Sequence, residues 1–362
     1  MEKILQGGYT TGASAAAGVK AALIYFQQKK IVREVEITAL DGTILKIPIE
    51  KIKQVGEKIS VEVIKRSGDD PDITNGTSIF TTVKKISSDE IIFRAGLGVG
   101  KITKPGLQIP VGEPAINPGP RQLIKNVAKE FSVTGLEVEI SIPAGVELAK
   151  KTLNPILGVE GGISVIGSTG VLRPMSEEAF KNSLVPQIDV AKAAGYENLI
   201  FVPGKIGEVI AEKIGLPSAA IIQTSNFVGF MLEKAAERNI SKIILCGHLG
   251  KLVKVAAGIF HTHNRMADGR LETLAAYSAA EGLNSEEVKK ILSSATTEEA
   301  AQIISANNFE HVYKKIAERA SIRAERHIFG KIQVGTILAD YSGKILGFDD
   351  SAEEISRNFL TL

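Results

Sequence analysis

The ionisable side chains of this sequence are concentrated between residues 242 and 270. Within that stretch the run HTHNRMAD, residues 261–268, holds two His, one Arg and one Asp. Groups of these types transfer protons, bind carboxylates or ligate metal ions, depending on what they face. The candidates for proton transfer are His248, His261 and Asp268, and the candidates for binding an anionic substrate are Lys251, His263 and Arg265.

A strand, a turn and a helix should position these side chains. The apolar run 243–246 predicts a parallel strand buried on both faces, because it has no polar face to present to water. Gly250 then favours a tight turn into a helix whose apolar residues recur at helical spacing. In open α/β sheets such a junction lies at the carboxyl end of the strands, where ligands bind.

The second half of the chain repeats this unit. Strands predicted at 199–202, 219–222 and 243–246 alternate with helices predicted at 177–194, 207–214 and 226–238, which is typical of a doubly wound parallel sheet. Small or polar residues end the three strands and should converge at one edge, where a ligand can approach Gly204, Thr224, Ser225, Asn226 and Gly247. Later elements are predicted as helices at 267–281, 285–293, 297–306 and 309–328 and a terminal hairpin at 331–348.

The first half predicts an α+β domain. In GYTTGAS, Ser14 should cap a helix that begins near Ala15. Residues 32–66 alternate as a meander of strands. The glycine-rich stretch 95–106 predicts a hairpin near a ligand, because no helix begins there to form a nucleotide-binding loop. The remaining elements are predicted as strands at 91–94 and 137–142 and helices at 121–131 and 144–153.

Glycine and proline are dense between residues 143 and 174, which marks a junction between domains. We therefore predict an α+β domain over 1–172 and an α/β Rossmann-like domain over 173–362. A linker explains these glycines but not the hydroxyls among them. The hydroxyl groups predicted to contact a substrate are those of Thr10, Thr11, Ser168 and Thr169.

Composition argues against several classes of protein. The 362 residues carry a formal net charge of +2 and no long basic run, so nucleic acid is not an expected partner. No run approaches the roughly 18 apolar residues of a membrane helix, and the amino terminus lacks an apolar signal core. Cys246 is the only cysteine, so an intrachain disulfide is impossible and a cytoplasmic location is expected. Composition does not decide whether the chain forms a homo-oligomer.

Two groups of residues raise the question of a bound metal. Asp69, Asp70 and Asp72 share a polar loop, but the residue order of an EF-hand is absent. His261 and His263 share a face only where the chain is extended. We therefore predict no protein-bound metal, although a metal-dependent hydrolase using His261, His263 and Asp268 remains an alternative. The string GHLGK lacks the spacing of a Walker loop, which argues against a nucleoside triphosphatase.

Six strings, taken in order, carry a resemblance to one enzyme family. They are GYTTGAS, DDPDITNG, GVGKITKPGL, GEPAINPGPR, GGISVIGSTGVLRPMSEEA and GHLGKLVKVAAGIFHTHNRMADGRLE. Together they resemble the cobalt-precorrin-5B (C1)-methyltransferase family of anaerobic cobalamin (vitamin B12) biosynthesis. Ala13-Ser14 is a departure, since the family pattern there is Thr or Ser followed by Cys, and any thiol role at that position is excluded.

The resemblance implies a reaction and a site. The methyl donor would be S-adenosyl-L-methionine, and the small or polar residues at the strand ends predict that it binds there. The acceptor would be a contracted tetrapyrrole that carries its own cobalt, methylated at ring carbon 1 to give cobalt-precorrin-6A. Its carboxylates would explain a role for the cations Lys251, Lys254, Arg265 and Arg270. The alternative from another class is a non-catalytic corrinoid or nucleotide carrier.

Overall fold

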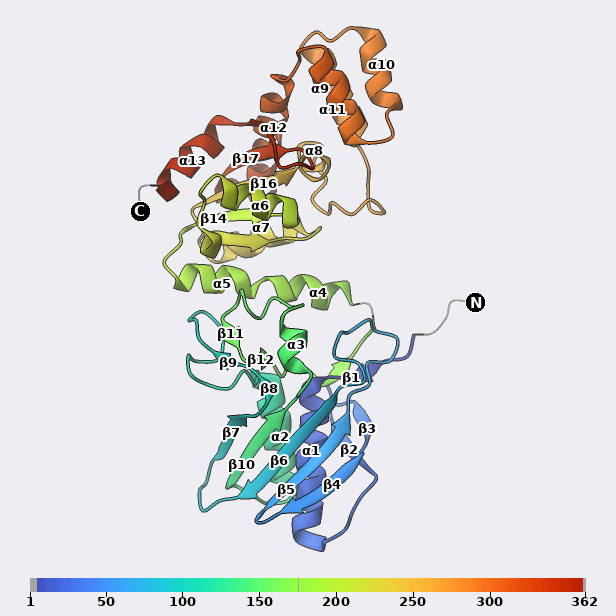
Figure 1. The fold of residues 1–362 in the computed structure, drawn as a ribbon, viewed down its shortest axis with the longest axis vertical. Helices are drawn as coiled ribbons and strands as arrows, with labels where there is room; N and C mark the ends of the chain where they lie inside the picture. Colours follow the sequence, from blue (N-terminus) through green and yellow to red (C-terminus); the bar gives the residue numbers. More distant parts are fainter. Residues whose placement is uncertain (1–4, 175, 361–362) are drawn as a thin grey trace. The chain divides into compact units, whose positions relative to one another are not determined.

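The computed structural model describes residues 5–174 and 176–360 and divides into two compact units, residues 1–177 and 178–362 (Figure 1). Residues 1–4, which belong to the segment predicted to lack a signal core, lie outside the described residues. Among the described residues, no helix combines the length and apolar character needed to cross a bilayer. Both units mix helices with sheets.

Unit 1 is built on a five-stranded sheet in the order β4-β5-β6-β10-β7. β10 is parallel to β7, and the other neighbouring strands are antiparallel. Every second residue of β5 and β6 is buried, as expected for strands that turn one face toward a core. The strands of this unit are β1 (Gly8–Tyr9), β2 (Glu34–Thr38), β3 (Ile44–Pro48), β4 (Lys51–Val55), β5 (Lys58–Ile64), β6 (Ser78–Lys85), β7 (Ile91–Ala95), β8 (Gly98–Val99), β9 (Lys101–Ile102), β10 (Leu136–Ser141), β11 (Val159–Glu160), β12 (Gly162–Ile163) and β13 (Val171–Leu172).

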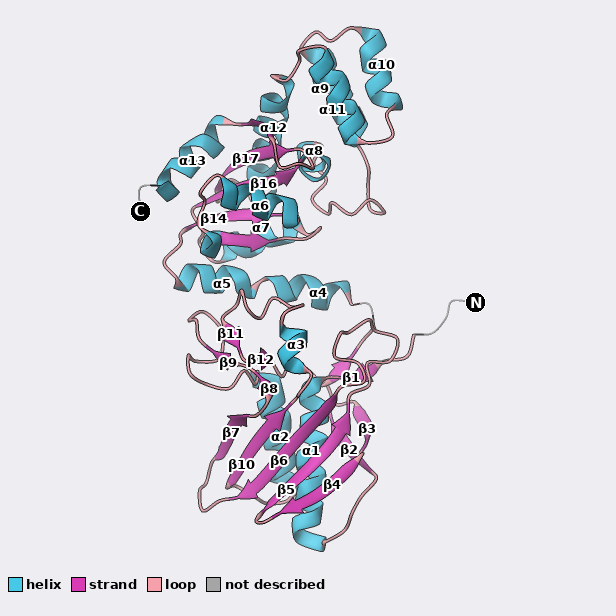
Figure 2. Ribbon diagram, viewed as in Figure 1, coloured by secondary structure: helices cyan, strands magenta, loops and turns pink. Residues whose placement is uncertain are grey.

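Helix α1 (Thr11–Gln28) packs against β5, β6 and helix α2 (Pro118–Glu130), and Figure 2 shows the two helices on one face of the sheet. Its close approach to β6 depends on Gly18, where a Cβ would lie 2.7 Å from the Thr81 side chain. Thr10 caps the helix, because its Oγ1 accepts from the Ala13 N–H at 3.2 Å. The prediction that Ser14 is the cap is wrong: Ser14 lies inside the first turn and donates to the Thr10 carbonyl.

The glycine-rich stretch after β7 is not the predicted hairpin. β8 pairs with β12 and β9 pairs with β11, so the two short strands belong to different ladders. This pairing needs close backbone contact, because a Cβ on Gly162 would lie 2.1 Å from the Gly98 carbonyl oxygen. The helix predicted at 144–153 is shortened to α3 (Gly145–Ala149).

Unit 2 is built on a five-stranded sheet in the order β15-β14-β16-β17-β18. The first four strands are parallel and β18 is antiparallel to β17. Helices α6 and α13 contact this sheet, as do α8 and α12, which also pack against each other. The elements are α4 (Glu177–Leu184), α5 (Pro186–Ala193), β14 (Asn198–Val202), α6 (Lys205–Lys213), a 3-10 turn (Ser218–Ala220), β15 (Ile221–Gln223), α7 (Val228–Glu237), β16 (Lys242–His248), α8 (Leu249–Ala256), α9 (Arg270–Ala280), α10 (Ser285–Ser293), α11 (Thr297–Ala306), α12 (Val312–His327), β17 (Gln333–Ala339), β18 (Ile345–Phe348) and α13 (Asp350–Leu360).

Three elements of unit 2 differ from the prediction. The strand expected over 219–222 is β15, which begins only at Ile221 because the residues before it form the 3-10 turn. The helix expected over 177–194 is two helices, and the second starts at Pro186, the first helical position, where proline is favoured. The hairpin expected over 331–348 is not terminal. β17 is an inner parallel strand of the sheet, and α13 follows β18. Asp349 begins that helix, since its Oδ1 accepts from the Ala352 N–H at 2.8 Å and the Thr336 N–H at 3.1 Å.

Candidate active site

Parallel pairing places the carboxyl ends of β14, β15 and β16 at one edge of the unit 2 sheet. The chain leaves β14 toward β15 on one side and returns to β16 on the other, so the order of the strands reverses between β14 and β16. Ligands bind at such reversals in open α/β sheets. Gly204 and Gly247 lie there. Gly204 has extended backbone with φ 178°, and a Cβ on it would meet nothing within 4 Å, so this position has open space.

The end of β15 contributes the run Thr224-Ser225-Asn226. Thr224 is fully buried. Ser225 has φ 52°, a left-handed conformation that is uncommon for a residue other than glycine and is found disproportionately at ligand sites. Asn226 links this edge to helix α8, because its Oδ1 accepts from Lys251 Nζ at 2.5 Å. Its carbonyl also accepts from the Thr262 N–H at 2.9 Å.

A pocket of about 230 Å³ lies beside this edge, within unit 2. Three predicted site residues line it together: His248, Lys251 and His263. Arg270, one of the four cations that the family resemblance linked to acceptor carboxylates, lines it as well. The lining residues that were not predicted are Gly250, Asn264, Thr297 and Tyr341. The pocket therefore combines the end of β16, the start of α8, the loop 257–269, the starts of α9 and α11, and the turn between β17 and β18.

Both ring nitrogens of His248 are engaged. Nδ1 accepts from the Gly250 N–H at 3.1 Å and so caps α8, and Nε2 lies 2.5 Å from Glu298 Oε1. Because Nδ1 is an acceptor, the proton sits on Nε2 and is donated to Glu298. The ring also stacks on Tyr341 at 3.9 Å between centroids. Burial lowers the pKa of His248 although Glu298 opposes the shift, which favours the neutral ring.

Lys254 organises the loop that carries His263. This lysine is fully buried, and its ammonium donates to the Thr262 carbonyl at 3.3 Å, to Asn264 Oδ1 at 2.8 Å and to the Ala267 carbonyl at 3.0 Å. All three donors of the ammonium are therefore used within the protein. The expectation that Lys254 faces substrate carboxylates is wrong for this reason.

Asp268 forms a bidentate ion pair with Arg270, with Nε to Oδ1 and Nη2 to Oδ2 both at 2.8 Å. The hydrogen bonds from Arg270 hold the pKa of Asp268 well below its usual range, and the Gly269 N–H adds to the effect. A carboxylate so strongly held in its ionised form is a poor proton acceptor near neutral pH. Its structural effect is to fix the guanidinium of Arg270, which lines the pocket.

The two remaining candidates of this loop lie outside the pocket lining. Arg265 is exposed, and its backbone N–H donates to His263 Nδ1 at 3.2 Å. His261 forms a backbone bridge with Phe227, and its ring centroid lies 5.0 Å from the Phe227 ring and 6.4 Å from the His263 ring. Among the residues that the structure describes, no group of three or more His, Cys, Asp or Glu side chains is placed to hold a metal ion.

The predicted hydroxyl residues of unit 1 gather at the start of α1. Thr10 caps this helix, and Thr11 Oγ1 accepts from the Ile166 N–H at 2.9 Å. Thr169 Oγ1 accepts from the Val171 N–H at 3.2 Å, whereas Ser168 is exposed. The fold thus brings together two strings that lie about 155 residues apart in the chain. Three of the four hydroxyls have hydrogen bonds that support the local backbone.

The acidic loop after β5 also has a structural role. Asp72 Oδ2 accepts from the buried Lys65 Nζ at 2.8 Å, and Asp72 Oδ1 accepts from the Thr74 N–H at 2.7 Å. Burial opposes ionisation of Asp72, yet the hydrogen bonds from Lys65 and Thr74 outweigh it and lower the pKa. The loop is therefore held in place by the ion pair between Asp72 and the buried Lys65.

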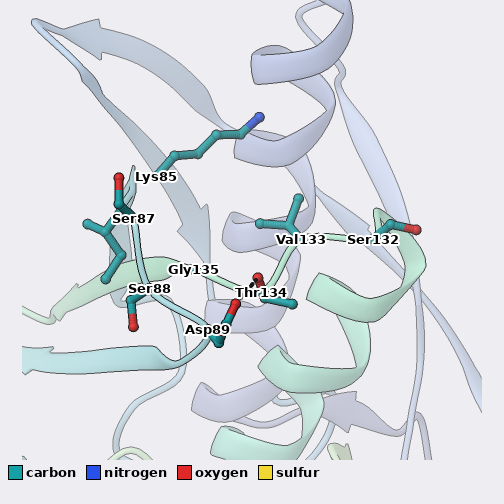
Figure 3. Close-up of a pocket in the computed structure, with 9 residues that line it drawn as sticks. Lys85, Ser87, Ser88, Asp89, Ser132, Val133, Thr134 and Gly135 are labelled. Carbon is teal, nitrogen blue, oxygen red and sulfur yellow. Dashed lines mark hydrogen bonds between the residues drawn. The ribbon is translucent and has the colours of Figure 1, made fainter.

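Figure 3 shows a larger pocket in unit 1, about 460 Å³, beside the β6–β7 turn and the loop between α2 and β10. None of the predicted site residues lines it. Asp89 and Thr134 point toward each other, with 3.5 Å between Oδ1 and Oγ1, and the Lys85 ammonium lies 5.3 Å from the Phe26 ring centroid. Pocket size therefore does not identify the site, and the charged groups around the smaller pocket are the better guide.

Sequence reasoning missed Glu298 and Tyr341, which contact His248, and Gly207. A Cβ on Gly207 would lie 2.2 Å from the Cys246 carbonyl oxygen, so this glycine lets α6 pack against β16. The spacing Gly204-Lys205-Ile206-Gly207 after a strand could have signalled it, since βα turns that bind nucleotides use glycine for such packing. Nothing in the sequence near Glu298 or Tyr341 indicates contact with His248.

The CbiD family matches residues 1–174, and its C-terminal domain matches residues 261–350. A protein of Moorella thermoacetica named cobalt-precorrin-5B C(1)-methyltransferase is 48% identical over 359 residues, which covers 98% of each chain. This chain belongs to the CbiD family. Family members of Desulfitobacterium hafniense and Methanocaldococcus jannaschii carry the same name. The first is 45% identical over 97% of this chain and 92% of its own, and the second is 48% identical over 94% and 95%.

A crystal structure of a cobalamin biosynthesis protein (CbiD) from Archaeoglobus fulgidus is also similar. It is 28% identical, covers 74% of this chain and 84% of its own, and superposes with a TM-score of 0.39.

Proposed function

We propose that this chain methylates carbon 1 of cobalt-precorrin-5B to give cobalt-precorrin-6A in cobalamin biosynthesis. The observation that carries this assignment is 48% identity over 98% of both chains with a protein named for that activity. The protein is a methyltransferase, and its acceptor is a tetrapyrrole whose cobalt is part of the substrate. Neither the hydrolase nor the carrier hypothesis has support from the named relatives.

The methyl donor in this proposal is S-adenosyl-L-methionine, whose sulfonium supplies the methyl group. The arrangement of unit 2 supports it, because we interpret the sheet as doubly wound, with α6 and α13 on one face and α8 and α12 on the other. The open space at Gly204 fits a ligand that approaches the backbone. The residues proposed to hold the donor are Gly204, Thr224, Ser225, Asn226 and Gly247.

The chain contributes alignment of the two reactants and exclusion of water, since methyl transfer from a sulfonium needs no covalent enzyme intermediate. Lys251, His263 and Arg265 are proposed to face acceptor carboxylates. Because both nitrogens of His248 are engaged and Asp268 is held ionised, we propose that these two residues position their neighbours. Of the three candidates for proton transfer, we therefore retain only His261 as a proposed proton acceptor. In unit 1, Thr10, Thr11, Ser168 and Thr169 remain proposed acceptor contacts.

The test of the function is direct. Purified protein incubated with cobalt-precorrin-5B and S-adenosyl-L-methionine should add one methyl group to the acceptor, detected by mass spectrometry, and release S-adenosylhomocysteine. Omitting the donor serves as the control. Acceptor that binds tightly but stays unmethylated, in the presence of the donor, would contradict the assignment and favour the carrier.

Gly204→Val tests the donor site. The backbone there is extended and a Cβ has open space, so the variant should fold with an unchanged melting temperature. A valine side chain in the donor's path should weaken S-adenosylhomocysteine binding about tenfold or more, equivalent to about 1.4 kcal/mol. Calorimetry that finds unchanged affinity in the folded variant would move the donor elsewhere, and the stretch Gly96 to Gly100 would be the next candidate.

A further inference from the structure

We propose that Lys251 and Arg270 form a clamp for one peripheral carboxylate of the acceptor, inside the pocket that they line with His248, His263, Asn264 and Thr297. We call this pocket the carboxylate clamp. The proposal rests on the proposed function, because it assumes a tetrapyrrole acceptor with acidic side chains. It assigns Arg270 to the substrate, and it gives Asn226 and Asp268 the role of positioning residues.

The charge of the clamp favours an anion. Its described lining includes one lysine and one arginine but no acidic residue. Two carboxylates that contact lining residues are already engaged, because Asp268 is paired with Arg270 and Glu298 with His248. Burial lowers the pKa of Lys251, and the charges of Lys254 and Arg270 add to this shift. An incoming carboxylate would relieve that unfavourable environment.

Both cations are held in place before any ligand arrives. Asn226 Oδ1 accepts one hydrogen bond from the Lys251 ammonium at 2.5 Å, which leaves two donors of that group. The Asp268 carboxylate accepts hydrogen bonds from Nε and Nη2 of Arg270, at 2.8 Å each. Nη1 of Arg270 can then donate to another acceptor. Groups fixed in this way lose little freedom on binding, so their hydrogen bonds contribute more to affinity.

The volume of the clamp suits one acidic substituent of the tetrapyrrole rather than the whole molecule. Its volume of about 230 Å³ is below the roughly 300 to 1,000 Å³ typical of pockets that enclose a small molecule. An acetate or propionate substituent fits such a space while the macrocycle stays outside. The amino-acid carboxylate of the donor has the same chemistry, and the experiment below separates these two sources.

The experiment compares Lys251→Met and Arg270→Gln with a matched control, Arg238→Gln. Arg238 forms a similar bidentate pair with Asp189 in the same unit, at 2.7 and 3.1 Å, and does not line the clamp. The side chains of Arg238 and Asp189 are 26% and 36% exposed, against 25% and 50% for Arg270 and Asp268. The control therefore reports the cost of breaking such a pair where no substrate is expected.

Three probes are titrated into the full chain: uroporphyrin, which carries acetate and propionate groups, S-adenosylhomocysteine, and 5′-methylthioadenosine, which lacks the amino-acid carboxylate. Each clamp variant should weaken uroporphyrin binding about tenfold, equivalent to about 1.4 kcal/mol, with less than a twofold change in Arg238→Gln. Arg270→Lys should recover part of the loss, because it keeps the charge but not the planar fork. Weakened S-adenosylhomocysteine binding with normal 5′-methylthioadenosine binding would support a carboxylate clamp that serves the donor.

Asp268→Asn tests the positioning role. It should raise the acceptor KM several-fold with little change in kcat, because it loosens a group used for binding. Normal uroporphyrin and S-adenosylhomocysteine affinity in both clamp variants would overturn the proposal. Failure of the proposed function has a different signature, since the unmodified chain would then leave cobalt-precorrin-5B unmethylated whatever the clamp variants do.

Discussion

His248 offers a sharp test of the site, because its geometry assigns it to positioning rather than to proton transfer. The perturbation is a pair of variants, His248→Asn and His248→Ala. The amide oxygen of Asn can replace Nδ1 as the acceptor for the Gly250 N–H, since Asn is among the best residues at a helix N-cap. Ala cannot accept this bond. Both variants remove the ring that stacks on Tyr341 and donates to Glu298.

The expected losses follow from these contacts. An N-cap contributes about 1 kcal/mol, a stacked pair of rings about 1 kcal/mol, and the hydrogen bond to Glu298 about 1 kcal/mol. His248→Ala should therefore lower the free energy of unfolding by about 3 kcal/mol, and His248→Asn, which keeps the cap, by about 2 kcal/mol. In a domain of this size each kcal/mol shifts the melting temperature by about 2 to 4 °C. The expected falls are about 6 to 12 °C for Ala and about 4 to 8 °C for Asn.

Activity separates the two roles. General acid–base catalysis contributes about 10² to 10⁴ in rate, so loss of a proton-transferring His248 would show in both variants. We expect His248→Asn to retain kcat within about tenfold of the unmodified chain, well short of that loss. The assay is steady-state methyl transfer at 25 °C, with thermal unfolding followed by fluorescence. A hundredfold fall in kcat in a folded His248→Asn variant would refute the reasoning.

Three further outcomes are expected. Since burial lowers the pKa of His248, the ring's stabilising effect is complete above its unfolded pKa of about 6.5 and declines as the pH falls through the folded pKa. Denaturant titrations should therefore show His248→Asn approaching the unmodified chain in stability toward pH 5, and a gap that widens in acid would contradict this. Lys254→Met should lower the free energy of unfolding by about 3 kcal/mol, because it leaves three acceptors without their charged donor; a normal melting curve would show that the loop is held otherwise. Arg265→Met should raise the acceptor KM about tenfold, because Arg265 is proposed to face an acceptor carboxylate and a charge-assisted hydrogen bond contributes roughly 1.5 to 3 kcal/mol; a rise of less than threefold, as expected for an exposed charge that contributes about 0 to 1 kcal/mol, would remove Arg265 from the acceptor site.

The sequence by itself determined elements whose signals are local. The apolar run 243–246 predicted a buried parallel strand, and β16 contains it, paired on both sides. The predicted helices 285–293 and 297–306 have the bounds of α10 and α11, because Asn284 and Thr296 cap them. The family strings also sufficed to identify the enzyme class. These signals need only a residue and its near neighbours in the chain.

Backbone partners were harder to predict. The glycines of 95–106 allowed a hairpin, yet β8 and β9 each pair with a strand about 60 residues later in the chain. The strand at 333–339 pairs with β18 as the predicted hairpin requires, but seven of its residues also pair with β16, so it lies inside the sheet and the hairpin is not terminal. A strand's pattern shows which faces are buried and does not name the neighbouring strand.

Tertiary structure alone decided which side chains form the site. Arg265 and Arg270 are five residues apart, and the sequence favoured Arg265; yet Arg270 enters the pocket, because buried Lys254 fixes the loop and Asp268 holds the guanidinium. Glu298 lies 50 residues from His248 in the chain and accepts the proton that the ring carries on Nε2. Tyr341 stacks on the same ring. In a loop without helical or strand periodicity, side-chain direction depends on the distant groups that hold the backbone, and these are brought near only when the chain folds.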